Sequence, residues 1–346
     1  MAIITPSGAG NWSSTGTWNG GVVPGAGDIV YFDGKIVTLD QDITVAELHN
    51  DDDGGTYTSG GYLNSQDLTT VHNVTVTERI EQGDTTTTNH NCVKGVYGLN
   101  VTVKDIYGPS SGGTQFAVNL AYGCTLDVTG SIFLQGGNQH AVNATNSLVR
   151  ANMLDRNGQS GSTYYCLFGA GGIFIVDSIP DGMGISTGML AFINSVTGGS
   201  AANQLGTNNV TVQIIESATG GSGSNADGCV CAINRYLRCG TATQGSGSSA
   251  HGIDQNGGVV IAREAVGTSS GSYGIDYSSV GLLSVETETG SFAVNDLGTG
   301  PMNNSAPEAL WDEIVSDEII SEWAGGGGGG GRAMPEIIRS SGLVRQ

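Results

Sequence analysis

The chain contains few basic residues. Its 12 Lys and Arg stand against 32 Asp and Glu, which gives a formal net charge of −20 at pH 7. A surface of this charge repels the phosphate backbone of nucleic acids, so we expect no nucleic-acid partner. The same repulsion disfavours acidic polysaccharides and acidic membrane surfaces as binding partners.

Long apolar runs are also absent. No stretch of 18 apolar residues occurs, which predicts that the chain does not insert into a membrane. Residues 1–6 contain neither a basic region nor a long apolar region, so we expect no Sec signal peptide. Charged residues make up only 13% of the chain and apolar residues 38%, a balance that predicts a folded rather than a disordered protein.

Glycine is abundant, with 58 residues, and a five-residue phrase recurs between the glycine-rich segments. The phrase Gln-Phe-Ala-Val-Asn at 115–119 returns as Gln-His-Ala-Val-Asn at 139–143, and we place a looser copy at 163–167. Later copies occupy residues 226–230, 250–254, 272–276 and 291–295, so the step between copies shortens toward the C-terminus. A β-rich chain with such a repeat is typical of a solenoid, in which each repeat forms one coil.

Short β-branched runs follow the same period and are bounded by Gly, Ser, Asn or Asp, which is the usual signal for strands. We therefore predict an all-β, single-stranded parallel β-helix over residues 51–300, with rungs of about 19–24 residues. A β-sandwich is the alternative, but it gives no reason for a phrase to recur at this step. In a solenoid, one position of the phrase should point into the core as a single apolar column, made of Val118, Val142, Ile253, Ile275 and Val294.

Residues 1–50 differ from the repeats and predict an N-terminal β cap. Within the cap, two predicted strands at 29–32 and 36–39 are joined by Asp-Gly-Lys at 33–35, a tight-turn sequence. Trp12 precedes the motif Trp-x-Gly-Gly-x-x-Pro-x-x-Gly-Asp-x-Val, which begins at Trp18. This stretch resembles the opening segment of β-helical surface proteins, including bacteriophage tail and virion proteins and large secreted bacterial proteins. The resemblance implies a capped β-helix and says nothing about chemistry.

The C-terminal residues depart from the solenoid pattern. Residues 301–324 are predicted to form a helix with one apolar side, opened by a capping-box sequence. Seven consecutive glycines at 325–331 predict a flexible linker, and residues 332–346 predict an anchoring arm. The predicted partner-binding residues of helix and arm are Trp311, Trp323, Arg332, Ile337, Ile338, Arg339, Leu343 and Arg345.

Five acidic residues at or just beyond strand ends are candidates for catalysis. If Asp105, Asp155 and Asp177 align on successive coils, neighbours among them could form the carboxylate pair that glycosidases use. Glu264 and Glu286 occupy comparable places on two later runs, one repeat apart. Acids at strand ends also simply begin turns, which is the simpler interpretation. His140 and His251 occupy the aromatic position of the phrase, which predicts stacking rather than catalysis.

We expect neither a cofactor nor a metal site. The acids at 51–53 are consecutive, whereas EF-type calcium loops alternate their ligands, so an exposed turn is favoured over a weakly held cation. Cys229, Cys231 and Cys239 lack a second paired motif and a histidine at ligand spacing, so reduced core thiols are favoured over zinc.

Together these features predict a structural protein of a virus particle, most plausibly a tailed bacteriophage. The chain would be a β-helical decoration, fibre or spike subunit on the exterior of the virion, forming a homotrimer and binding other virion proteins through its C-terminal arm. A tailspike-like glycan hydrolase acting on a host surface glycan is one alternative. A secreted bacterial adhesin is another, because fold alone does not decide function.

Overall fold

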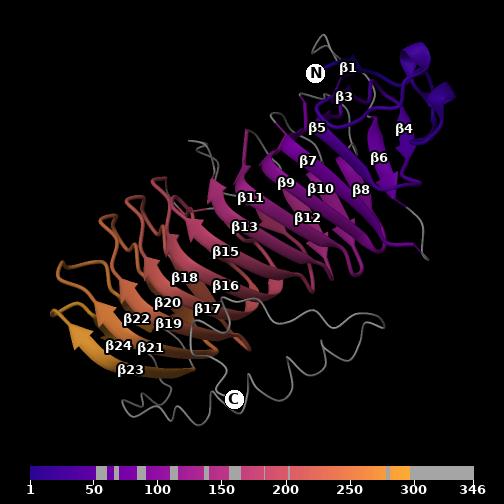
Figure 1. Ribbon diagram of the computed structural model, residues 1–346. Coiled ribbons are helices and arrows are strands. Elements are labelled where there is room, and N and C mark those ends of the chain that lie inside the picture. The colour runs from indigo at the N-terminus through magenta and orange to yellow at the C-terminus, as the bar shows by residue number, and fades with distance from the viewer. Residues whose placement is uncertain are drawn as a thin grey trace.

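The computed structural model describes residues 1–51, 61–65, 70–83, 91–109, 116–135, 140–155, 165–182, 184–201, 203–277 and 281–296. These residues form an all-β parallel solenoid, with strands stacked coil on coil along one axis (Figure 1). The predicted fold class is thus confirmed. The predicted helix, linker and arm, including Trp311, Trp323, Arg332, Ile337, Ile338, Arg339, Leu343 and Arg345, lie outside the described residues.

The long strands form one 13-stranded parallel sheet that runs the length of the solenoid. In spatial order its strands are β1 (Ile3–Ile4), β3 (Ile29–Tyr31), β5 (Ile43–His49), β7 (His72–Glu81), β9 (Leu99–Tyr107), β11 (Thr125–Phe133), β13 (Leu148–Asp155), β15 (Ile173–Ile179), β16 (Gly188–Thr197), β17 (Val210–Thr219), β19 (Tyr236–Thr243), β21 (Val259–Val266) and β23 (Leu282–Thr289).

Short strands form the opposite wall of the core in two sheets. The first contains β2 (Gly10–Asn11), β4 (Ile36–Thr38), β6 (Tyr62–Ser65), β8 (Asn91–Gly95), β10 (Phe116–Ala121), β12 (Val142–Thr145) and β14 (Leu167–Phe168). The second contains β18 (Cys229–Ala232), β20 (Ile253–Asn256), β22 (Ile275–Tyr277) and β24 (Val294–Asp296). Single parallel bridges at Ile185 and Thr207 connect the two sheets, so the wall is continuous in register.

On this wall, one inward-facing position is matched in register from coil to coil. We call the residues at this position the inner column. Its members are Val37, Leu63, Val93, Val118, Val142, Leu167, Ile185, Thr207, Cys229, Ile253, Ile275 and Val294. All are buried except Val294, which is partly buried and packs against the core. The predicted apolar column is therefore confirmed, and it is longer than the phrase copies indicated.

The third copy of the phrase was placed one residue too early. The register pairs Val142 with Leu167, so Leu167 rather than Cys166 occupies the inner column. Coil length also varies more than the spacing of the phrase copies predicted. Leu63 and Val93 are successive members of the inner column, and so are Leu167 and Ile185. The coil that connects Leu63 to Val93 is therefore much longer than the coil that connects Leu167 to Ile185.

The long strands supply the rest of the core. Val45, Val76, Val103 and Val128 lie opposite one another in register and are all buried. Beyond them the register shifts, as at a β-bulge, and a second buried series follows with Leu48, Ile80, Ile106 and Ile132. Because a bulge bends a strand, one long strand can line two sides of a narrow core.

Side chains in this second series become smaller toward the C-terminal coils. The series continues from Ile179 and Val196 to Ala218, Ala242 and Ala265. Glycine backbones approach neighbouring coils closely in the same region: a Cβ added at Gly198 would lie 1.9 Å from the carbonyl oxygen of Ala226. The C-terminal half is therefore packed through backbone contacts as well as through side chains.

A buried polar pair lies within the core between β17 and the short-strand wall. Thr207 and Gln213 are both fully buried, and the Thr207 hydroxyl donates to Gln213 Oε1 at 2.6 Å. Gln213 Nε2 in turn donates to the carbonyl oxygen of Val230, one coil further on, at 2.8 Å. The amide and hydroxyl groups therefore have partners inside the core, which is the condition for burying them at low cost.

The N-terminal segment is continuous with the sheets. Asp33 and Gly34 both adopt positive φ, as a tight turn requires, but they do not close a hairpin. Instead β3 joins the long-strand sheet and β4 joins the short-strand wall, both in parallel pairing. The two predicted strands and the tight turn between them are present, and the turn is a corner between two walls of one coil rather than a hairpin.

Trp12 and Trp18 contribute to the core at this end. Both are buried, their rings meet edge to face with centroids 4.8 Å apart, and Trp18 Nε1 donates to the carbonyl oxygen of Trp12 at 2.8 Å. The short 3-10 helices η1 (Thr15–Thr17) and η2 (Asn19–Gly21) flank Trp18. No helix among the described residues is long and apolar enough to cross a membrane.

Candidate functional site

The register does not bring the five candidate acids together. Asp155 lies opposite Phe133, which lies opposite Tyr107, whereas Asp105 lies opposite Arg79 in a different column. Asp105 instead accepts a hydrogen bond from the backbone amide of Ser131 at 2.8 Å. Asp177 is exposed and accepts from Asn194 Nδ2 at 3.1 Å.

Glu264 and Glu286 are not opposite one another either. The residue of β23 that faces Glu264 is Thr287, and the Thr289 hydroxyl donates to Glu264 Oε1 at 3.1 Å. The vertical alignment on which a carboxylate pair depended is therefore absent in both groups of acids. Asp105, Asp177 and Glu264 lie within β9, β15 and β21, and their hydrogen bonds join neighbouring strands rather than begin turns.

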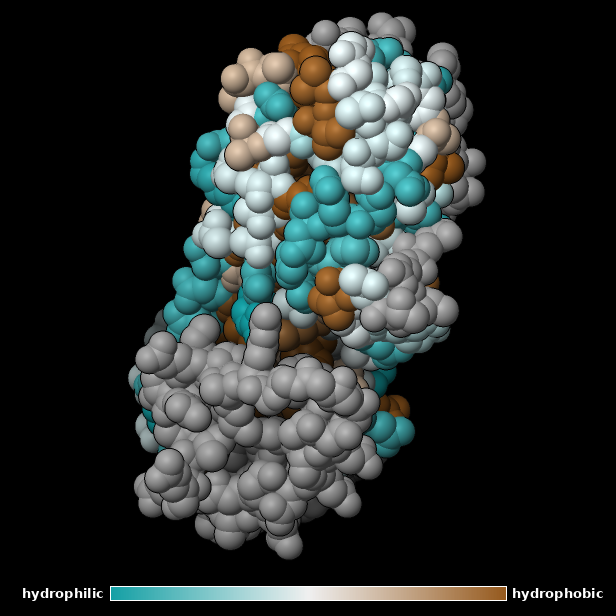
Figure 2. All heavy atoms as spheres, turned by 45° about the vertical axis from the view of Figure 1, so that its right-hand side comes forward, coloured by the Kyte–Doolittle hydropathy of each residue, from teal (hydrophilic) through white to brown (hydrophobic). Residues whose placement is uncertain are grey.

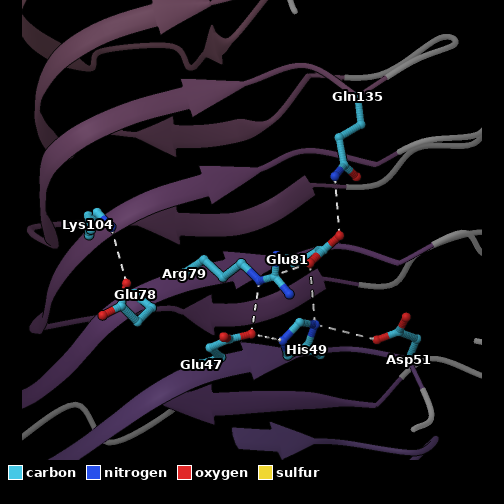
Figure 3. Close-up of polar contacts among 8 residues, drawn as sticks. All are labelled: Glu47, His49, Asp51, Glu78, Arg79, Glu81, Lys104 and Gln135. Carbon is cyan, nitrogen blue, oxygen red and sulfur yellow. Dashed lines mark hydrogen bonds and ion pairs between the residues drawn. The ribbon is translucent and has the colours of Figure 1, made fainter. Parts of the chain in front are cut away.

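Two polar clusters that the candidate list did not contain are present on the solenoid. The first, which we call the ion-pair cluster, consists of Glu47, His49, Asp51, Arg79, Glu81 and Gln135 (Figure 3). The ends of β5 and β7 supply its central four residues, because Glu47 pairs in register with Arg79 and His49 with Glu81.

His49 is at the centre of the ion-pair cluster and is only 2% exposed. Its Nε2 lies 2.7 Å from Glu47 Oε2, and its Nδ1 lies 3.6 Å from Glu81 Oε2 and 3.9 Å from Asp51 Oδ1. The Tyr31 ring stacks on the imidazole with centroids 4.4 Å apart. The acidic neighbours and the ring fix the imidazole from several sides.

Arg79 forms ion pairs with two carboxylates, Glu47 on the adjacent coil and Glu81 on its own strand. Its Nε lies 2.9 Å from Glu47 Oε2 and 3.2 Å from Glu81 Oε2, and its guanidinium lies over the Tyr107 ring at 6.0 Å. Burial raises the pKa of Glu47, but the hydrogen bond with His49 and the charge of Arg79 outweigh burial and leave this pKa lowered. The cluster therefore forms an ionic network that joins adjacent coils.

We expect Arg79→Met to weaken this network. Without the guanidinium the pKa of Glu47 is no longer held as low, so the stability that is present above the ordinary glutamate pKa and lost as pH falls is reduced. The free energy of unfolding near pH 7 should fall by about 1 kcal/mol, since Arg79 is partly solvated. The difference from the parent protein should shrink in acid, as Glu47 becomes protonated in both states.

Urea unfolding followed by circular dichroism at several pH values measures this effect. Lys104→Met is the matched control, because Lys104 and Glu78 form a 3.2 Å pair with both side chains about half exposed (Figure 3). Equal and small losses in the two variants would show that the ion-pair cluster adds no stability beyond that of a surface pair.

The second cluster lies on the last described coils, and we call it the carboxyl cluster. It consists of Asp227, just before β18, His251, just before β20, Asp254 in β20 and Asp276 in β22. Asp254 and Asp276 are opposite one another in register. Burial raises the pKa of Asp227 to about 7 and that of Asp254 to about 6, and the neighbouring carboxylates add to both shifts.

Aromatic side chains stack along the same wall at the second position of the phrase. Phe116 and His140 have centroids 6.3 Å apart, and His251 and Tyr273 have centroids 5.5 Å apart. The stacking predicted for His140 and His251 is confirmed. Because each ring covers the face of its neighbour, these rings offer mainly their edges to solvent and make a poor platform for a sugar ring.

The thiols are part of the core. All six cysteines are free and buried, and Cys229 and Cys231 face inward from the same strand. Burial raises the pKa of Cys231 to about 12 and that of Cys239 to about 12. Within the described part of the chain, no three His, Cys, Asp or Glu side chains are arranged to hold a metal ion. Asp51 belongs to the ion-pair cluster, whereas Asp52 and Asp53 lie outside the described residues.

A sequence signal for the ion-pair cluster exists in hindsight. Glu47 and His49 alternate on one strand and Arg79 and Glu81 on the next, so a period of two already places each pair on one side of its strand. What the sequence lacks is the coil length that sets these pairs opposite each other. Comparisons with known proteins find no family model, curated protein or solved structure that matches the chain.

Proposed function

We propose that the chain is a structural subunit of a virus particle, a β-helical decoration, fibre or spike on its exterior. The observation that carries the proposal is the use of polar side chains outside the core to join one coil to the next. Asn143 Nδ2 donates to Asn119 Oδ1 at 2.9 Å, and Arg150 Nη1 donates to Asp127 Oδ1 at 2.7 Å. Side chains committed to their neighbours in this way stiffen a shaft and are not free to bind a substrate.

The surface supports the same function. Where the face in Figure 2 shows described residues, it is mainly hydrophilic or neutral, with apolar side chains in separate patches. Together with the net charge of −20, this keeps a long shaft in solution and away from other acidic surfaces. On this proposal the subunit is a homotrimer, and its arm, residues 332–346, attaches it to other proteins of a tailed bacteriophage.

Deleting residues 332–346 tests the attachment. The glycine linker should decouple the arm from the shaft, so the melting temperature should stay within about 1 °C of the parent value. The shortened protein should no longer copurify with particles from the native source, as judged by immunogold labelling in electron micrographs. A variant in which the basic residues Arg339 and Arg345 are both replaced by Gln should give an intermediate loss of labelling.

Labelling at the parental level after the deletion would contradict attachment through the arm. Particles that carry none of the parent protein would contradict the virion proposal itself. The same preparation can be incubated with surface polysaccharide of the host cell. Release of oligosaccharides would favour the glycan-hydrolase alternative, and tight binding to host cells by a chain that is absent from particles would favour the adhesin.

A further inference from the structure

We propose that the carboxyl cluster is a proton-operated clamp, which holds the last described coils of the solenoid closed in acid and loosens them as the pH rises. The inference rests on the geometry of Asp227, His251, Asp254 and Asp276 and does not depend on the proposed function. It concerns β18, β20, β22 and β24, the short-strand wall at the C-terminal end of the described solenoid (Figure 1).

The four residues link three consecutive coils. Asp227 is only 4% exposed, and its Oδ1 accepts the backbone amide of His251 at 2.7 Å. His251 Nδ1 accepts the backbone amide of Tyr273 at 3.0 Å, so the proton of the neutral imidazole is on Nε2, 3.7 Å from Asp276 Oδ2. Asp227 therefore bonds the first of these coils to the second, and His251 bonds the second to the third.

Positive charge is scarce around these carboxyls. No Lys or Arg of the described residues forms an ion pair with Asp227, Asp254 or Asp276, and Arg235 donates instead to Thr211 Oγ1 at 2.8 Å. Asp254 Oδ2 accepts from Asn256 Nδ2 at 2.6 Å, which adds a hydrogen bond but no charge.

The groups that face Asp227 are the other members of the cluster and a thiol. On the following coils they are His251, Asp254 and Asp276, and within its own coil Cys229 is close enough to interact electrostatically. The preceding coil contains one titratable side chain, Glu216, which is exposed on β17 in the long-strand sheet. Three carboxyl groups thus share one imidazole and no permanent cation, so full ionisation leaves repelling charges in a desolvated place.

The direction of the pH dependence follows from these shifts. The pKa values of Asp227 and Asp254 are raised to about 7 and about 6 in the folded state, from 3.8, so their stabilising contribution is complete below pH 3.8 and is lost as pH rises through 6 and 7. Burial lowers the pKa of His251, which opposes the effect below pH 6.5 by one proton. The two carboxyl groups stabilise the folded coils in acid and the imidazole destabilises them. Because two protons outweigh one, the coils are more stable in acid.

The other end of the solenoid responds in the opposite sense. Hydrogen bonds from the backbone amides of Gly25 and Ala2 lower the pKa of Asp28, and bonds from Asn73 lower that of Asp42. Together with Glu47, these groups stabilise the N-terminal coils above the ordinary carboxyl pKa and lose that contribution in acid. Because each coil of a solenoid contacts only its neighbours, the two responses should be separable along the chain.

Hydrogen exchange with mass spectrometry on the full chain tests the clamp, with each rate divided by the intrinsic rate at the same pH. Between about pH 5.5 and 8.5 the opening constant of peptides from β20 to β24 should rise about tenfold, the net effect of the three titrations. Peptides from β7 and β9 should show no such rise. An opening constant of β20 to β24 that is equal at the two pH values would overturn the proposal.

Neutral amides in place of the carboxyls separate proton binding from a general effect of pH. In Asp227→Asn with Asp254→Asn, the amide oxygen at 227 can still accept from His251, and opening should no longer rise with pH. Asp177→Asn is the matched control, because Asp177 is exposed and accepts one side-chain hydrogen bond; it should keep the tenfold rise. Should the double variant not fold, Asp254→Asn alone should still reduce the rise. A tenfold rise retained in the amide variants would also overturn the clamp.

Discussion

Replacing Val142 with Asp is expected to unfold the central coils. Val142 is fully buried in the inner column, between Val118 and Leu167 on the adjacent coils. An aspartate there would place a carboxylate among apolar side chains with no partner, and we expect a loss of more than about 4 kcal/mol in the free energy of unfolding. Urea titration followed by circular dichroism gives this value, and a very low yield of soluble protein would be the extreme result.

Thr145→Asp provides the matched control. Thr145 belongs to the same strand but is partly exposed on its outer side, so the same carboxylate stays hydrated there. Its cost should be within about 0.5 kcal/mol. Similar losses for the two variants would mean that the strand tolerates no carboxylate on either side, and the inward direction of the inner column would lose its support.

Gly198→Ala should be the second most damaging change. The added methyl group would lie 1.9 Å from the carbonyl oxygen of Ala226 and 2.7 Å from the backbone nitrogen of Gly221. Both obstacles are backbone atoms on the neighbouring coil, so they cannot move aside as a flexible side chain could. We expect a loss of about 3 kcal/mol, measured as a shift of the urea midpoint.

Gly25→Ala controls for the loss of chain flexibility in the unfolded state. A Cβ at Gly25 meets nothing within 4 Å, so this change should leave stability unchanged or raise it slightly. If Gly198→Ala were equally harmless, the coils in this region would have room to separate, and backbone contact would not limit their packing.

The sequence was sufficient to predict the solenoid, because the alternation of apolar residues and the recurring phrase are local patterns. It misplaced the third copy of the phrase because Tyr164 and Tyr165 are adjacent aromatics and offer two alignments, of which only the register selects one. The tight turn at Asp33 and Gly34 was recognised, but the same positive φ serves a hairpin and a corner between two walls equally well.

The functional clusters were harder to predict because they depend on distant residues. Glu47 and Arg79 are far apart in the sequence and meet only because one coil brings their strands into register. In the sequence, Asp227 is only the second residue of one copy of the phrase. Its burial results from the packing of the coils around it. The candidates chosen from strand ends failed to align because the bulges and unequal coils change which residues face each other.

The unequal coils have a consequence for the dimensions of the molecule. Every coil advances the chain by one strand spacing, about 4.8 Å, whether the coil itself is short or long. The 13 strands of the described sheet therefore span about 58 Å, and residues added at a corner widen the cross-section without lengthening it. The length of the solenoid can therefore change only in steps of one coil. Its cross-section, in contrast, can change by single residues.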